Sequence, residues 1–155
     1  MSEKSALDLV EAHRYFSAEC FNRAWDLIEL PARTPEQDRT MLQLGLTSLW
    51  HWSQRPDRTT TTLSVGYWQV ARIYALLGQA DEARRYAQLC LESAQAGDVP
   101  PFYLAYAYEA LARAEAVARD WVMMKDYLRQ ARAAGDLVTD ADARRQLLDD
   151  LAGIK

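Results

Sequence analysis

The apolar and polar residues of this chain follow the period of a helix along almost its whole length. Apolar residues recur at helical spacing, and no convincing segment shows the two-residue alternation typical of a strand. This pattern predicts an all-α protein with seven or eight helices. We expect these helices at residues 5–18, 21–30, 35–53, 64–77, 81–96, 102–118, 120–134 and 139–151.

Capping residues and helix breakers mark most of the boundaries. Thr34 followed by Pro35 predicts a helix start, and Gly78 predicts a helix end. Pro56 and four consecutive threonines predict the longest loop, over residues 54–62. Neither glycine nor proline separates the first two expected helices, so these two segments are either separate helices or one long helix.

The second half of the chain contains an internal duplication. Shifting the sequence by 41 residues superimposes identical residues at helical spacing, as expected of a repeated helix-turn-helix unit. We expect Ala71 and Ala112 to lie at close helix crossings and Tyr67 and Tyr108 to be mostly buried. The matches are Tyr67 with Tyr108, Ala71 with Ala112, Arg72 with Arg113, Ala75 with Ala116, and Tyr86 with Tyr127.

The first copy of this unit resembles a tetratricopeptide repeat. It reads Tyr67-x3-Ala71-x2-Tyr74-x3-Gly78-x4-Ala83-x3-Ala87-x2-Cys90, with small residues where helices approach closely and a glycine before the turn. The second copy resembles it less, because Arg119 replaces the glycine and Met124 an alanine. The shift of 41 residues also exceeds the roughly 34 usual in this family.

This resemblance is good over about residues 64–135 and implies stacked antiparallel helix pairs in a tetratricopeptide-like superhelix. The family binds its partners in a groove lined by the first helices of the pairs. We therefore expect one domain over residues 1–155 with a C-terminal capping helix. Its parts are degenerate helices in 1–62, clearer repeats in 63–97 and 102–135, and the cap helix in 139–152.

Composition narrows the possible partners and the compartment. The formal net charge of −4 and the pI near 5.2 argue against nucleic acid, which requires a basic surface. No apolar run approaches a membrane span, and the first residues resemble neither a signal nor a transit peptide. We therefore expect a cytoplasmic protein in which Cys20 and Cys90 stay reduced.

The chain contains no motif of a known catalytic, nucleotide or metal site, so we expect no enzyme, no cofactor and no metal. Its two histidines, His13 and His51, are best interpreted as satisfied or half-buried side chains. One alternative is a metal site that they form with Glu11 or Glu19. Another is a helical enzyme whose active site contains both histidines and Glu109.

Three of the five tryptophans lie on either side of the predicted long loop. Trp50 and Trp52 point about 200° apart on a helix, so at most one of them is fully buried. These aromatic residues, with Trp68, either fill a junction between helices or line an interface. The second possibility would make the chain a self-associating module, for example a homodimer.

The predicted groove carries a set of polar residues one turn apart on the first helix of each pair. Arg72 and Arg113 match across the shift, and two guanidinium groups side by side suit a carboxylate or a phosphate. Glu109 lies four residues before Arg113 and offers an ordinary helix salt bridge instead. We expect a non-enzymatic adaptor that binds a peptide or a small anion through Trp68, Gln69, Arg72, Leu76, Tyr106, Glu109 and Arg113, with His13 in the matching place of the N-terminal unit.

Overall fold

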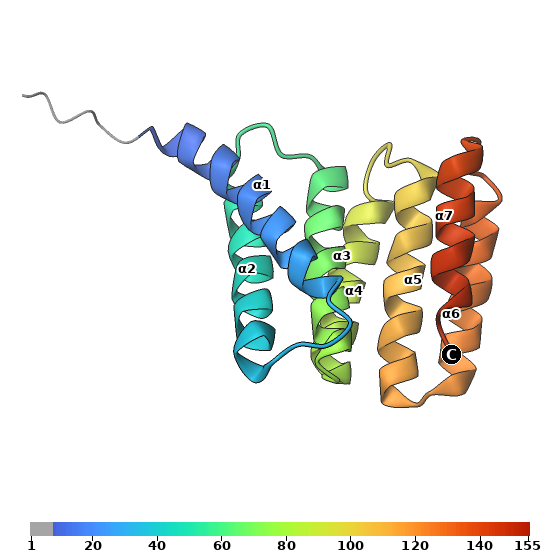
Figure 1. Cartoon of the computed structure of the whole chain (residues 1–155). Helices are drawn as coiled ribbons and strands as arrows, with labels where there is room; N and C mark the ends of the chain where they lie inside the picture. Colours follow the sequence, from blue (N-terminus) through green and yellow to red (C-terminus); the bar gives the residue numbers. More distant parts are fainter. Residues whose placement is uncertain (1–7) are drawn as a thin grey trace, which may run out of the picture. The chain divides into compact units, whose positions relative to one another are not determined.

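The computed structural model describes residues 8–155, and all of their regular structure is helical (Figure 1). Neighbouring helices pack as antiparallel pairs, which confirms the predicted all-α fold of stacked helix pairs. The seven helices of these residues are α1 (Leu9–Ile28), α2 (Pro35–Gln54), α3 (Thr60–Leu76), α4 (Ala80–Gln95), α5 (Pro101–Ala118), α6 (Trp121–Gly135) and α7 (Ala141–Ala152).

The chain divides between Arg58 and Thr59 into two compact units. The described part of the first unit is the helical hairpin α1–α2, and the second unit contains α3 to α7. Each unit is described by itself below. No helix within residues 8–155 has the length and the apolar content needed to cross a membrane.

In the first unit, α1 is one continuous helix, so the expectation of two helices at 5–18 and 21–30 is wrong and the single-helix alternative is right. The expected start at residue 5 lies outside the described residues. Asp8 caps the helix, because its side chain accepts hydrogen bonds from the backbone N–H groups of Val10 and Glu11. Extending a helix requires less free energy than nucleating a second one, and no breaker interrupts this sequence.

Helix α2 begins as the Thr34-Pro35 pair predicts. The Thr34 hydroxyl accepts a hydrogen bond from the backbone of Gln37, whose side chain accepts one from the Thr34 backbone in return. Small side chains bring α2 close to α1, since the buried Ser48 hydroxyl donates to the Ser17 carbonyl at 2.7 Å. The core between α1 and α2 therefore consists mainly of small side chains.

The loop predicted over residues 54–62 is shorter in the structure, because α3 already begins at Thr60. Thr59 caps this helix by accepting a hydrogen bond from the backbone N–H of Thr62, and the Thr62 hydroxyl accepts one from the Thr59 backbone. The threonine run is therefore a helix start. Its hydroxyl groups bind N–H groups that have no partner within the helix.

The second unit repeats one backbone design at a distance of 41 residues. Gly78 and Arg119 both adopt left-handed φ angles, of 73° and 61°, just after the ends of α3 and α5. The residues that follow, Gln79 and Asp120, each donate a backbone hydrogen bond of 3.0 Å to a carbonyl five residues earlier. The turn between the two helices is thus the same in both pairs.

The matched side chains repeat as well. The rings of Tyr67 and Tyr86 have centroids 6.5 Å apart, and those of Tyr108 and Tyr127 are 6.4 Å apart. Ala71 and Ala112 are buried, as expected of residues at close helix crossings, while the tyrosines are partly buried against the same core. These contacts support the duplication inferred from the sequence.

Helix α7 packs on α5 and α6, as a capping helix does. Leu147 and Leu151 of its apolar stripe are fully buried, and Ala143 is partly buried. A Cβ atom at Gly135 would lie only 2.7 Å from Leu147 Cδ2, so α6 and α7 approach closely there and a larger residue would displace the Leu147 side chain.

Candidate anion-binding site

A buried carboxylate lies at the centre of the second unit. The side chain of Glu109 in α5 is only 1% exposed. Its Oε2 atom accepts a hydrogen bond of 2.8 Å from Trp68 Nε1, and its Oε1 atom accepts one from Arg113 Nε. Arg72 Nη1 lies 3.5 Å from the same Oε1 atom. One negative charge therefore holds two guanidinium groups and one indole.

The helix geometry explains this convergence. Arg113 follows Glu109 by four residues and so lies on the same face of α5. Arg72 and Trp68 are also four residues apart and come from α3, which packs directly on α5. The repeat thus places the same two positions of neighbouring helices opposite each other.

Two guanidinium groups lie beside the Glu109 carboxylate, and the negative charge of Asp150 also acts on Arg72. Burial and, secondly, the charge of Arg113 lower the pKa of the Arg72 guanidinium, whereas Glu109 opposes this effect. The guanidinium still remains protonated at neutral pH. Its buried Nε atom has no hydrogen-bond partner among the described residues, which is uncommon for a buried donor.

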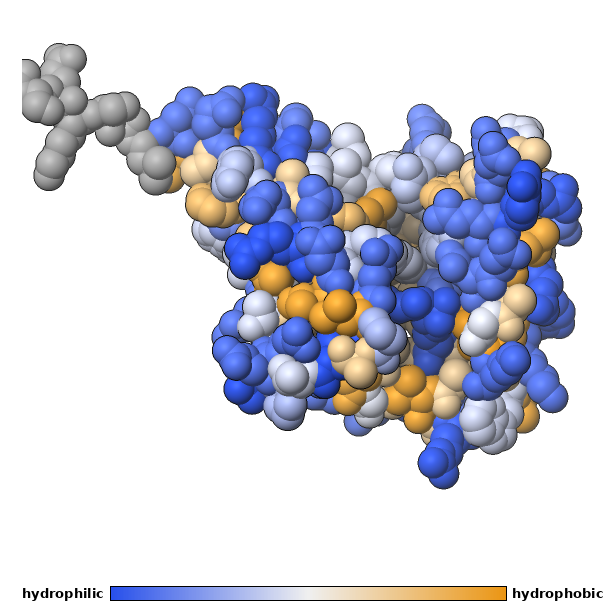
Figure 2. Space-filling model, viewed as in Figure 1, coloured by the Kyte–Doolittle hydropathy of each residue, from blue (hydrophilic) through white to orange (hydrophobic). Residues whose placement is uncertain are grey.

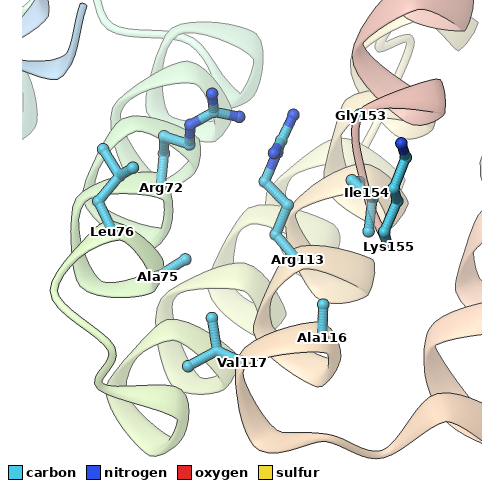
Figure 3. Close-up of a pocket in the computed structure, with 9 residues that line it drawn as sticks. All are labelled: Arg72, Ala75, Leu76, Arg113, Ala116, Val117, Gly153, Ile154 and Lys155. Carbon is cyan, nitrogen blue, oxygen red and sulfur yellow. The ribbon is translucent and has the colours of Figure 1, made fainter. Parts of the chain in front are cut away.

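A pocket of about 170 Å³ opens beside the two arginines. Figure 3 shows the guanidinium groups of Arg72 and Arg113 and the ammonium group of Lys155 at one end of it. Small apolar side chains line the other end. The complete lining consists of Arg72, Ala75 and Leu76 from α3, Arg113, Ala116 and Val117 from α5, and Gly153, Ile154 and Lys155 after α7.

The residues after α7 form the third wall of this pocket, and contacts between α5 and α7 hold them in place. Arg113 Nη2 donates to the Asp150 carbonyl at 3.3 Å, and the Tyr106 hydroxyl donates to Asp150 Oδ2 at 2.5 Å. Burial and this hydrogen bond raise the pKa of Tyr106. The Tyr106 ring in turn meets Trp68 edge to face, with centroids 5.7 Å apart. Together these contacts fix the position of Arg113.

Most of the residues predicted for the groove meet in this cluster, but they differ in their access to solvent. Arg72, Arg113 and Leu76 line the pocket, whereas Gln69 and Glu109 are completely buried. The Glu109–Arg113 salt bridge that the sequence offered is present, and Arg72 and Trp68 join it. The sequence analysis did not single out Ala75, Ala116, Val117, Gly153, Ile154 and Lys155 as site residues, although the first two match across the 41-residue shift.

His13 lies in the first unit, where it contacts the only other histidine of the chain. The Nδ1 atoms of His13 and His51 are 2.8 Å apart, and both side chains are partly exposed. Burial and, to a smaller extent, the charge of His13 lower the pKa of His51. Within residues 8–155 no three or more histidine, cysteine or acidic side chains gather as metal ligands.

The other aromatic residues of α2 are open to solvent in different degrees. Trp50 is 55% exposed, and Trp52 lies under the guanidinium carbon of Arg55 at 3.9 Å from the ring centroid. Tyr15 and Phe16 of α1 are also exposed, at 61% and 43%. These side chains give the first unit an aromatic surface.

Both cysteines are buried free thiols. The Cys90 thiol donates to the Ser64 carbonyl at 3.3 Å, and burial raises its pKa to about 12. Burial also raises the pKa of Cys20. Since the thiolate is the reactive form, this environment makes neither cysteine a good nucleophile.

No family model, curated protein or solved structure was found to match this chain.

Proposed function

We propose that this chain is a non-enzymatic, tetratricopeptide-like adaptor that binds the carboxylate end of a peptide, or a small anion, in the pocket between α3, α5 and the residues after α7. One observation carries the proposal: two guanidinium groups and an ammonium group border one end of a pocket whose other end is apolar (Figure 3). Such a pocket suits a ligand that joins a carboxylate to a small aliphatic group.

The buried Glu109 prepares this site for an anion. It holds Arg72 and Arg113 side by side, so these two side chains would lose little further conformational entropy when a ligand binds. Glu109 itself does not line the pocket and therefore would not directly contact the ligand. The Nη atoms of Arg72 would supply donors for a carboxylate, since its Nε atom is buried.

Two other parts of the proposal, that the adaptor is not an enzyme and that it is cytoplasmic, rest on general chemistry. Guanidinium groups stay charged at neutral pH and do not exchange protons, so they serve binding better than acid–base catalysis. Buried, poorly reactive thiols suit a reducing compartment, and we place the adaptor in the cytoplasm on this ground.

The test is peptide binding by the parent protein and by Arg72→Ala and Arg72→Lys. Short peptides that end in a free aliphatic residue, their C-terminal amides and inorganic phosphate are titrated at low and high salt. We expect binding of free carboxylates, weakened by salt, and a loss of about tenfold or more in Arg72→Ala. Arg72→Lys should recover only part of the affinity, because it lacks the planar fork.

The matched control is Arg85→Ala in α4, whose side chain is 71% exposed and lies 3.9 Å from Glu82. This variant should bind as the parent does. Loss of stability in Arg72→Ala without any loss of binding would assign Arg72 a purely structural role. Equal binding of acids and amides would contradict a carboxylate site.

A second candidate function is self-association through the aromatic surface of the first unit, formed by Tyr15, Phe16 and Trp50. All three side chains are more than 40% exposed, which is unusual for such large apolar groups. Hydrophilic residues cover most of the face shown in Figure 2, and apolar ones appear there only in small groups. Measuring the mass in solution of the parent and of Phe16→Ser tests this function, because a dimer formed by this surface should dissociate in the variant.

A further inference from the structure

The two histidines of this chain are 38 residues apart in sequence and meet across the hairpin of the first unit. His13 comes from α1 and His51 from α2, and their Nδ1 atoms face each other at 2.8 Å. In a direct hydrogen bond at this distance, one nitrogen carries the proton and the other accepts it with its lone pair. Without that proton, the lone pairs of both nitrogens would point at the same small region of space.

We propose that His13 and His51 together bind a divalent transition-metal ion of the class that prefers imidazole, such as Cu²⁺, Ni²⁺ or Zn²⁺. Metal–nitrogen bonds of about 2.0–2.1 Å at a tetrahedral angle place two ligand nitrogens about 3.3 Å apart. The histidines need to separate by only about 0.5 Å to reach this distance, which small side-chain rotations provide.

The protonation states allow the ion to replace the hydrogen bond between the two imidazoles, and the protein neither gains nor loses a proton. In the hydrogen-bonded pair one imidazole carries its proton on Nδ1, and the other accepts with its Nδ1 lone pair. When the ion binds, the proton of the donor moves to Nε2 of the same ring through water. Both rings stay neutral, both Nδ1 atoms bind the ion, and the ion releases two of its own water ligands.

The surroundings hold the rings in place and leave room for further ligands. The Trp50 ring lies 5.4 Å from His13 and 4.9 Å from His51, and the Phe16 ring lies 5.4 Å from His51, between centroids. Both histidines are partly exposed, so water can complete the coordination. Two protein ligands are fewer than the four of a closed structural zinc centre, so a bound ion would keep water ligands.

Nearby charges do not prevent an ion from approaching. Arg14, one residue after His13, lies 3.5 Å from Glu11 in an exposed ion pair. Arg55 of the same unit is bound by both carboxylate oxygens of Asp57, at 2.9 and 2.8 Å. Each of these guanidinium groups thus has its own carboxylate. This site lies in the first unit and shares no residue with the pocket of the second unit.

The test is a titration of the full, tag-free chain with CuSO₄ and with ZnCl₂, followed by calorimetry and by tryptophan fluorescence. We expect one ion per chain. Cu²⁺ should quench the fluorescence of Trp50, whose ring touches both histidines. His13→Ala and His51→Ala should each weaken binding by about tenfold or more, because even changes outside the first ligand shell have effects of that size. Trp121→Phe in α6 is the control, because this residue of the second unit is 48% exposed and its variant should bind Cu²⁺ and be quenched as the parent is.

Electron paramagnetic resonance of the Cu²⁺-loaded parent gives an independent result, because it does not depend on whether a variant folds. Two equivalent imidazole nitrogens should split the copper signal, and the His13→Ala spectrum should show one nitrogen. The proposal is wrong if the double variant His13→Ala/His51→Ala binds both ions as tightly as the parent does. It is equally wrong if the parent spectrum shows no imidazole nitrogen.

Discussion

Trp68 in α3 and Glu109 in α5 occupy the same position of the two helix pairs in the second unit, 41 residues apart, but they differ completely in chemistry. One is an indole donor and the other a buried carboxylate, and they bind each other at 2.8 Å. Four residues later, both helices carry an arginine that lies beside this carboxylate. The duplicated backbone aligns the two positions, and their divergence creates the contact between the pairs.

The largest effect should follow from removing the carboxylate on which both pairs depend. Glu109→Ala leaves Arg72 and Arg113 beside a buried space without their shared partner, and breaking a buried ion pair in this way costs about 3–5 kcal/mol of unfolding free energy. Trp68→Phe, at the same repeat position, removes only one donor and should cost about 1–3 kcal/mol. Urea unfolding of both variants measures the difference. Equal losses would show that Glu109 is no more central than its counterpart.

The next effect concerns a feature that both pairs share. Ala71 and Ala112 are 2% and 0% exposed at matching helix crossings. Ala71→Leu and Ala112→Leu should each lower the free energy of unfolding by about 1–3 kcal/mol, because the added methyl groups have no space. If either variant melts like the parent, the two crossings are not equivalent and the comparison between the pairs fails at that position.

The sequence predicts the parts of this structure that depend on nearest neighbours along the chain. Thr34 and Pro35 predict the start of α2, and Gly78 predicts the end of α3, because caps and breakers act within one turn. The prediction of a loop over the four threonines is wrong, because Thr59 is the N-cap of α3 and the next three lie in its first turn. Their β-branched side chains suit extended backbone, but at the first turn of a helix their hydroxyl groups serve as caps.

The sequence predicts much less of the sites, since these depend on distances between segments. Helical spacing placed Arg72, Glu109 and Arg113 on facing sides of α3 and α5, and these residues do meet. The same reasoning had no means of placing the residues after α7, where Lys155 completes the pocket. The sequence analysis considers His13 and His51 together only as an alternative, because their contact depends on the register of a hairpin.

An effect of similar size should reveal the difference that α7 introduces between the two pairs. Tyr106 binds Asp150 of α7, whereas the position 41 residues earlier is Val65. At neutral pH, Tyr106→Phe should lose about 1.5–3 kcal/mol of unfolding free energy. The pKa of Tyr106 is raised in the folded protein, so the unfolded chain releases this proton first as the pH rises above about 10. The stabilising contribution is therefore present below that pH and lost above it.

This pH dependence is measured as the difference in unfolding free energy between the parent and Tyr106→Phe. The difference should shrink as the pH increases from about 8 to about 11. A constant difference over this range would mean that the hydroxyl of Tyr106 does not contribute through its proton.

The smallest effect should have opposite signs in the two helix pairs, and so it tests the comparison most directly. Gly78 and Arg119 hold the same left-handed turn, but an arginine pays a backbone cost of about 1–2 kcal/mol there that a glycine does not. Arg119 is exposed, so Arg119→Gly loses few contacts, while the glycine gains freedom in the unfolded chain that offsets part of the benefit. We expect a net stabilisation of about 0.5–1 kcal/mol.

Gly78→Ala should instead destabilise the protein by about 1 kcal/mol. This loss comes from strain of the backbone alone, because a Cβ atom there meets no other atom within 4 Å. Thermal melts of both variants give the two signs, and a destabilised Arg119→Gly would mean that the arginine side chain, rather than the turn, determines this position.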